Sequence, residues 1–108
     1  MKGKTSISKL KSKISDSISI NNNATIYLFG SYAKGKQTAQ SDVDLLVIAD
    51  KKDTAKAIVH QLYKKLSDVE LDYDILGLTK KALLKQLQES TFYNNIINNG
   101  IILYGKQI

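Results

Sequence analysis

Paired acidic side chains at the start of an apolar run are the clearest chemical signal in this chain. Asp42 and Asp44 stand two residues apart and lead into the run Leu45 to Ala49. Residues two apart on a strand point to the same side, with Cα atoms about 6.5–7 Å apart. Two carboxylates so placed repel each other unless a cation lies between them. Because hard oxygen ligands suit Mg²⁺ or Mn²⁺, the pair predicts a divalent-metal site.

A third carboxylate is expected from the segment Glu70 to Leu76. Acidic and apolar residues alternate there, so Asp72 and Asp74 share one side of the predicted strand. Either can join Asp42 and Asp44. Asp74 is favoured because it lies nearer to the end of the strand, which Gly77 is expected to terminate. Three carboxylates from neighbouring strands can hold two ions about 3.5–4 Å apart, the arrangement used for in-line phosphoryl displacement.

A small turn with groups suited to phosphate precedes the acidic pair. Gly30 and Ser31 follow an apolar segment, and Lys34 lies in the same loop. A glycine directly after a buried strand lets backbone amides approach a phosphate, and the serine hydroxyl adds a donor. All sixteen basic residues are lysine. A triphosphate must therefore be held by lysine point charges or backbone amides, without the bidentate fork of arginine.

The elements that position these residues indicate one α/β domain over residues 1–108. A small mixed sheet with helices packed on it is expected. Apolar spacing and capping residues predict helices over 5–19, over 54–66 with Asp53-Thr54 as its cap, from Thr79 through Leu87, and over about 90–98 with an end at Asn99-Gly100. Strands are predicted over Thr25–Phe29, Val43–Ala49, Glu70–Leu76 and Ile101–Tyr104.

Composition excludes several other classes of protein. The chain has no cysteine, so disulfides and thiolate metal sites are ruled out. Its longest uninterrupted apolar run has five residues, which is too short for a membrane span, and residues 1–20 show no secretory pattern. We expect a cytoplasmic protein. The net charge of +6 is compatible with phosphate-rich or acidic partners, although a solvated lysine surface is the favoured interpretation.

Gly30-Ser31, ten intervening residues and then Asp42-Val43-Asp44 resemble the signature of the minimal nucleotidyltransferases of the DNA polymerase β superfamily. The segment Tyr73 to Leu76 resembles the place where that family keeps its third carboxylate. The ending Asn99 to Gly105 is similar to the family's usual close. The resemblance covers about residues 22–106, which is most of the chain.

This resemblance implies a polymerase β palm-like fold that binds a nucleoside triphosphate with two Mg²⁺ ions, Mn²⁺ being the alternative. By position, Asp42, Asp44 and Asp74 would hold the metals, and Asp74 would also help to activate the acceptor hydroxyl. Gly30 and Ser31 would hold the β- and γ-phosphates, with Lys34 as a further nucleotide-binding residue. The acceptor oxygen attacks the α-phosphorus and pyrophosphate leaves, a reaction that depends mainly on charge neutralisation and positioning.

Small members of the family are paired with a helical HEPN-type protein. The resemblance therefore implies transfer of AMP from ATP to a tyrosine of such a toxin, as the antitoxin of a type VII toxin–antitoxin pair. One alternative is the same chemistry on a small molecule or an RNA end. A non-catalytic binding subunit is another. Nucleic acid is a less favoured partner, no membrane partner is expected, and a homo-oligomer is left open.

Overall fold

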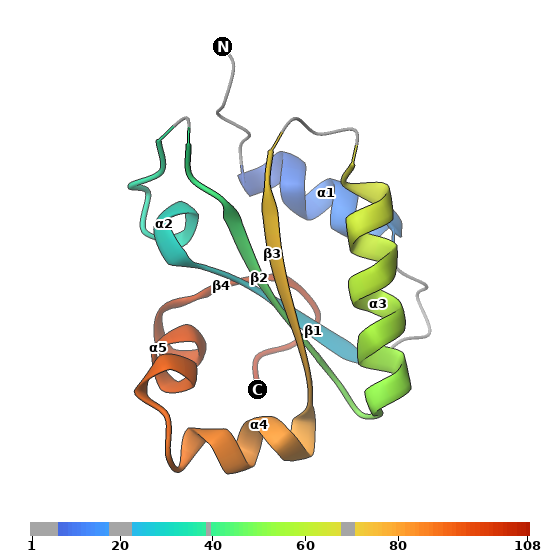
Figure 1. The fold of residues 1–108 in the computed structure, drawn as a ribbon, viewed down its shortest axis with the longest axis vertical. Helices are drawn as coiled ribbons and strands as arrows, with labels where there is room; N and C mark the ends of the chain where they lie inside the picture. The colour runs from blue at the N-terminus through green and yellow to red at the C-terminus, as the bar shows by residue number, and fades with distance from the viewer. Residues whose placement is uncertain (1–6, 18–22, 39, 68–70) are drawn as a thin grey trace.

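The computed structural model describes residues 7–17, 23–38, 40–67 and 71–108. Over these residues a four-stranded mixed sheet forms in the order β3-β2-β1-β4, with helices on both faces (Figure 1). The strands are β1 (Ala24–Phe29), β2 (Val43–Ala49), β3 (Tyr73–Thr79) and β4 (Ile101–Tyr104). The helices are α1 (Ile7–Ser17), α2 (Gly30–Ala33), α3 (Lys52–Lys65), α4 (Lys80–Leu87) and α5 (Thr91–Asn99). The predicted α/β fold with a small mixed sheet is confirmed.

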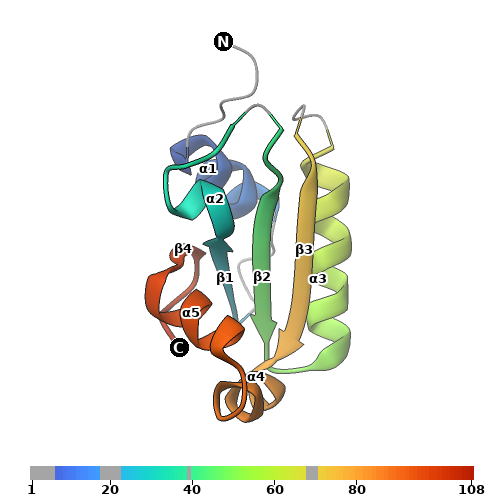
Figure 2. The same cartoon turned by 60° about the vertical axis from the view of Figure 1, so that its left-hand side comes forward.

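The sheet mixes both kinds of strand pairing. β1 lies antiparallel to both β2 and β4, whereas β2 and β3 run parallel. Parallel neighbours need a crossover connection of a dozen or more residues, and α3 supplies it. As a result β2 and β3 both begin beside the end of β1, so the residues at these three strand ends come together (Figure 2).

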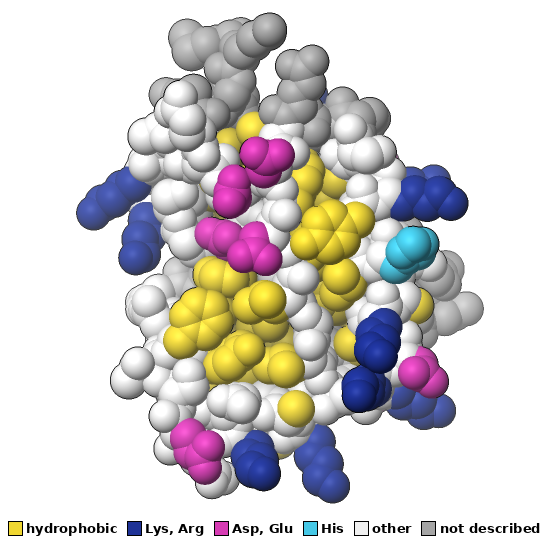
Figure 3. Space-filling view, in the orientation of Figure 1, with side chains coloured by type: hydrophobic (Ala, Val, Ile, Leu, Met, Phe, Trp, Pro, Cys, Tyr) yellow, Lys and Arg dark blue, Asp and Glu magenta, His cyan; other side chains and the backbone are white. Residues whose placement is uncertain are grey.

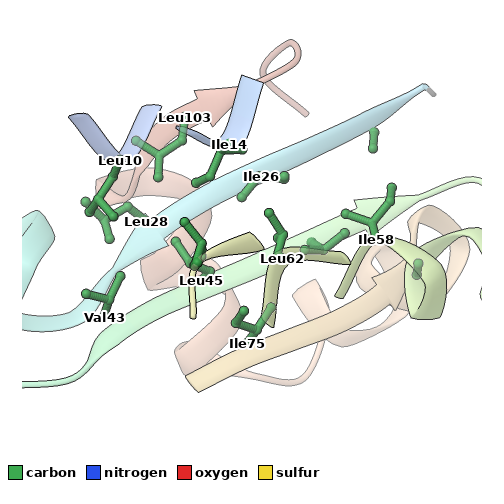
Figure 4. Close-up of a cluster of buried hydrophobic side chains, with 14 of the residues drawn as sticks. Leu10, Ile14, Ile26, Leu28, Val43, Leu45, Ile58, Leu62, Ile75 and Leu103 are labelled. Carbon is green, nitrogen blue, oxygen red and sulfur yellow. The ribbon is translucent and has the colours of Figure 1, made fainter. Parts of the chain in front are cut away.

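One face of the sheet is closed by α1 and α3. Figure 4 shows Leu45 and Ile75 from the sheet pointing toward Leu62 of α3, while Leu28 meets Leu10 of α1. The alternating residues of the central strands supply this core because every second side chain points to the same face. Fully burying one such side chain stabilises the fold by roughly 1.5–3 kcal/mol.

The other face carries a smaller apolar cluster under α4 and α5. Tyr27 and Leu46 of the sheet pack there with Leu83 of α4 and Ile96 of α5. β2 therefore buries apolar side chains on both faces, as the unbroken Leu45 to Ala49 run predicts. Among the described residues, no helix combines the length and the apolar character needed to cross a membrane.

Three predicted element boundaries were wrong: the start of α3 and both ends of β3, which begins at Tyr73 and leaves Leu71 and Asp72 outside the strand. α3 begins at Lys52, and its N-cap residue Lys51 makes no side-chain capping hydrogen bond. Asp53 lies in the first turn, where its negative charge interacts favourably with the helix dipole. β3 does not stop at Gly77 but continues to Thr79. Gly77 packs closely under α3, since a Cβ there would approach Cγ2 of Val59 to 3.0 Å. This glycine therefore allows close helix–strand packing and is not a strand breaker.

The helix start at Thr79 is confirmed. Its Oγ1 accepts a hydrogen bond from the Ala82 amide at 3.1 Å, as expected of an N-cap threonine. The end of α5 at Gly100 is also confirmed, and the Gly100 amide donates to the Ile96 carbonyl at 2.7 Å. Residues 5–6 and 18–19 of the predicted first helix, together with Glu70 of the predicted third strand, lie outside the described residues.

Candidate active site

The sheet register brings the predicted carboxylates of two strands side by side. Asp44 on β2 pairs directly with Asp74 on β3, and on its other side it pairs with Phe29 of β1. Asp42 lies immediately before β2, two residues from Asp44, so their side chains share a face. Figure 3 shows acidic side chains gathered on this face next to a hydrophobic patch.

The environment of Asp44 reflects this crowding. Partial burial raises the pKa of the Asp44 carboxyl above its ordinary value, and the neighbouring charges of Asp74 and Asp42 raise that pKa further. All three effects act against the ionised form. A cation placed among these oxygens would remove the repulsion, which is the electrostatic situation that a metal-binding carboxylate set creates.

Gly30 begins α2 directly against the acidic pair. Its φ of +75° lies in the left-handed region, which favours glycine. A Cβ at this position would overlap Oδ2 of Asp44, so a methyl group there would displace the Asp44 carboxylate. Position 30 therefore needs glycine for two separate reasons, its backbone conformation and its contact with the Asp44 carboxylate.

A pocket of about 400 Å³ opens at this place. Four of the predicted site residues line it: Gly30, Lys34, Asp44 and Asp74. The volume falls in the range of small-molecule and cofactor sites. The other lining residues are Phe29, Ala33, Leu76, Phe92, Asn95, Ile96, Asn99 and Gly100.

Two predicted residues, Asp42 and Ser31, do not line this pocket. Asp42 is exposed and acts on Asp44 through its charge. Ser31 is the second residue of α2, and its carbonyl accepts a hydrogen bond from the Lys36 amide at 2.9 Å, which folds the loop back over α2. The structure thus brings Gly30 and Lys34 to the pocket that Asp44 and Asp74 line, and Ser31 is not among the lining residues.

Between the two candidates for the third carboxylate, the geometry favours Asp74. Asp74 lines the pocket and faces Asp44 in register, whereas Asp72 does neither. The Asp72 carbonyl instead accepts the Val43 amide at 2.8 Å, a bond that aligns the starts of the two strands. Asp72 thereby has a backbone role in holding the register that sets Asp44 opposite Asp74.

The donor set fits Mg²⁺ or Mn²⁺ in its chemistry, because it consists of carboxylate oxygens. Within the described ranges, no group of three or more His, Cys, Asp or Glu side chains is arranged to hold a metal ion. Mg²⁺ usually keeps several water ligands and takes one or two protein carboxylates together with substrate phosphates. Asp44 and Asp74, which lie in register at the pocket, could supply those two carboxylates, and Asp42 is the third predicted ligand.

The far wall of the pocket was not anticipated from the sequence. It comes from α5, which contributes Phe92, Asn95 and Asn99. Residues 90–98 were predicted only as a helix. The sequence contains two asparagine pairs four residues apart, Asn94/Asn98 and Asn95/Asn99, and each places two amides on one face of the helix. Only the fold shows that the second pair lines the pocket.

A model of the polymerase beta nucleotidyltransferase family matches residues 9–108. Two proteins of Methanocaldococcus jannaschii, each named "putative protein adenylyltransferase", are similar in sequence. One is 33% identical over 76 residues, covering 70% of this chain and 74% of that protein. The other is 30% identical over 95 residues, covering 73% of this chain and 76% of that protein.

Solved structures share the fold. A chain from a crystal structure of a toxin–antitoxin with AMP-PNP aligns with a TM-score of 0.54 at 24% identity, over 95% of this chain and 76% of that chain. A structure from Sulfolobus solfataricus, described as a "putative nucleotidyltransferase", aligns with a TM-score of 0.50 at 16% identity, over 93% of this chain and 80% of that one. With the family match over nearly the whole sequence, the chain belongs to the polymerase beta nucleotidyltransferase family.

Proposed function

We propose that this nucleotidyltransferase transfers AMP from ATP, with Mg²⁺, to a tyrosine hydroxyl of a helical HEPN-type toxin, and so acts as its antitoxin. The observation that carries the proposal is the register of Asp44 and Asp74 inside a pocket that also contains Gly30 and Lys34. Two carboxylates, a lysine and a glycine around one cavity suit a triphosphate whose α-phosphorus is attacked by an oxygen.

The residues divide the work between charge and position. Bound Mg²⁺ would supply charge neutralisation for the phosphate oxygens and the leaving pyrophosphate. Asp42, Asp44 and Asp74 would hold that charge in place, and Asp74, which is exposed, would accept the proton of the incoming hydroxyl. Gly30 would let the triphosphate approach the backbone, and Lys34 would offset phosphate charge. Ser31 does not line the pocket and would add its hydroxyl donor from the neighbouring position in the chain.

Support for a protein acceptor comes from the relatives. The M. jannaschii proteins are named as protein adenylyltransferases, and a fold neighbour was crystallised as a toxin–antitoxin with AMP-PNP. This chain also has a feature that fits a large acceptor. The acidic end of the pocket lies open on the surface, with Asp42 and Asp74 exposed, so a side chain presented by another protein can reach it.

The metal-dependent step is tested by calorimetry with AMP-PNP in MgCl₂ and in EDTA. We expect binding in MgCl₂ that the Asp42→Asn, Asp44→Asn double variant loses, because two of the three metal-holding carboxylates are gone. The matched control is Asp50→Asn, an exposed acid just beyond the opposite end of β2. If the double variant binds AMP-PNP in MgCl₂ as the wild type does, the assignment of these carboxylates is wrong.

The transfer step is tested with ATP labelled at the α-phosphate and whatever protein co-purifies with the chain. We expect label on a tyrosine of that protein, reduced at least about a hundredfold by the double variant, as is typical when transition-state charge stabilisation is removed. The AMP adduct is located by mass spectrometry. Label confined to RNA or to a small molecule would replace the protein acceptor with one of the other acceptor classes.

A further inference from the structure

The pocket has two chemically different ends. Asp44 and Asp74 lie at one end, next to Gly30 and Lys34, where phosphate and metal are expected. The wall that α5 contributes carries no charge, since its pocket-lining residues are aromatic, amide or aliphatic. A nucleotide has the same division, with a charged phosphate chain at one end and a neutral base at the other.

The aromatic part of this wall is a ring that is fixed in place yet uncovered. Phe92 packs edge-to-face against Phe29, with ring centroids 5.6 Å apart and planes at 89°. It meets Tyr93 in the same manner at 5.1 Å and 82°. Phe92 is nevertheless 48% exposed, a large value for a phenylalanine held between two rings. Such a ring offers a platform on which a base can stack.

The amide part of the wall is an ordered asparagine pair. Nδ2 of Asn99 donates to Oδ1 of Asn95 at 2.5 Å, one helical turn away. This bond leaves the Asn95 amide nitrogen as a donor and the Asn99 oxygen as an acceptor. A donor beside an acceptor is the complement of a purine edge such as that of adenine, whose amino group donates next to a ring nitrogen that accepts.

The other two asparagines of α5 show that the pair is not a general property of this helix. The Asn94 amide is used inside the protein, where its Nδ2 donates to the Leu87 carbonyl at 2.6 Å and to the Ser90 carbonyl at 2.9 Å. Asn98 is exposed and does not line the pocket. Asn95 and Asn99 are thus the α5 amides that a ligand in the pocket can reach.

We propose that this wall of α5 is the base-binding subsite, with Phe92 stacking on the purine and the Asn95–Asn99 pair hydrogen-bonding to its edge. The proposal rests on the proposed function, because it assumes that the triphosphate lies at the acidic end. It identifies the residues that distinguish a nucleoside triphosphate from a bare polyphosphate. The substrate class is a purine nucleotide, read by two neutral amides and one ring.

The test compares two ligands that share phosphates but differ in the base. Binding of AMP-PNP and of inorganic tripolyphosphate, both in MgCl₂, is measured by calorimetry for Asn95→Ala, Asn99→Ala and Phe92→Leu. We expect the asparagine variants to weaken AMP-PNP binding about fivefold to tenfold, as the loss of one hydrogen bond does. Phe92→Leu should weaken it about tenfold through lost stacking. Tripolyphosphate binding should be unchanged in all three variants.

Asn98→Ala is the matched control, because it removes an identical amide one residue away from Asn99 and outside the pocket. It should bind both ligands as the wild type does. The subsite is overturned if the α5 variants bind AMP-PNP normally, or if they lose AMP-PNP and tripolyphosphate to the same extent. In both cases wild-type Mg²⁺-dependent binding leaves the proposed function standing. If the wild type binds neither ligand, the proposed function fails and the subsite fails with it.

Discussion

The two faces of the sheet are built from the same strands but are closed to different extents. On the face covered by α1 and α3, a continuous set of buried apolar side chains runs along β2 through Val43, Leu45 and Val47. On the other face, α4 and α5 cover Leu46 and Ile48, whereas the beginning of the strand carries Asp44 next to an open pocket. β2 therefore contributes buried apolar side chains to both faces of the sheet and the acidic side chain of Asp44 to one face.

This difference separates the source of stability from the source of function. Burial of apolar side chains is the main favourable term in folding, and the closed face provides most of it. Carboxylates can be gathered only where water or a cation reaches them, since an unpaired charge in a closed core is costly. The short helices α4 and α5 leave room for such a place at one end of the sheet.

The largest effect should come from breaking the closed face. Leu45→Ala removes a fully buried side chain that points toward Leu62, and we expect a loss of about 2–5 kcal/mol in the free energy of unfolding. The same substitution at Leu84, which is 53% exposed on α4, should change that free energy by no more than about 0.5 kcal/mol. Urea unfolding measures both. Similar losses for the two variants would contradict the assignment of Leu45 to the packed core.

A smaller loss of stability is expected from alanine substitutions at two glycines, only one of which contacts the site. Gly30→Ala places a Cβ against Asp44 Oδ2 at a left-handed φ, and we expect it to cost about 2–3 kcal/mol and to abolish Mg²⁺-dependent AMP-PNP binding. Gly35→Ala is the control, because Gly35 has a similar φ of +69° with nothing within 4 Å of the added Cβ. It should cost about 1 kcal/mol through the backbone alone and leave binding intact.

If Gly35→Ala abolished binding as well, the loop conformation and not the contact with Asp44 would be the requirement at position 30. The pair of variants therefore distinguishes a glycine kept for its φ from one kept for the carboxylate beside it. Calorimetry gives the AMP-PNP affinity of both variants, and urea unfolding gives their free energies of unfolding independently.

The sequence predicted those features that depend on local spacing. Asp42 and Asp44 share a face because strands have a period of two, and that follows from the order of the residues alone. The strand from Val43 to Ala49 and the cap at Thr79 were predicted for similar local reasons. The error at Gly77 concerns local propensity, which the packing of β3 against α3 overrode. The error at Lys52 is a shift of the helix start, because α3 begins before the expected cap at Asp53-Thr54.

The parts that were not predicted depend on contacts between distant segments. The preference for Asp74 was based on a strand end at Gly77, whereas Asp74 lies at the start of β3 and is set opposite Asp44 by the register of β3 against β2. Nothing in the order of residues shows that α5 faces the acidic pair, so Phe92 and Asn95 were not recognised as part of the site. Pocket composition is a property of the assembled fold, whereas motif spacing is a property of the strand.

The smallest predicted effect concerns the electrostatic repulsion around Asp44, on the face of the sheet that α4 and α5 cover. Because burial and the charges of Asp74 and Asp42 raise the pKa of Asp44 in the folded state, ionising Asp44 at neutral pH destabilises the fold. Asp44→Asn should therefore raise the free energy of unfolding at pH 7 in EDTA by about 0.5 kcal/mol, a modest value because solvent screens a largely accessible carboxylate. The gain should disappear near pH 3, where Asp44 of the wild type is protonated in both states. Asp50→Asn, just beyond the other end of the strand, should show no such gain. If Asp44→Asn is less stable than the wild type at pH 7, the Asp44 carboxylate makes favourable contacts in the metal-free fold and the expected repulsion is wrong.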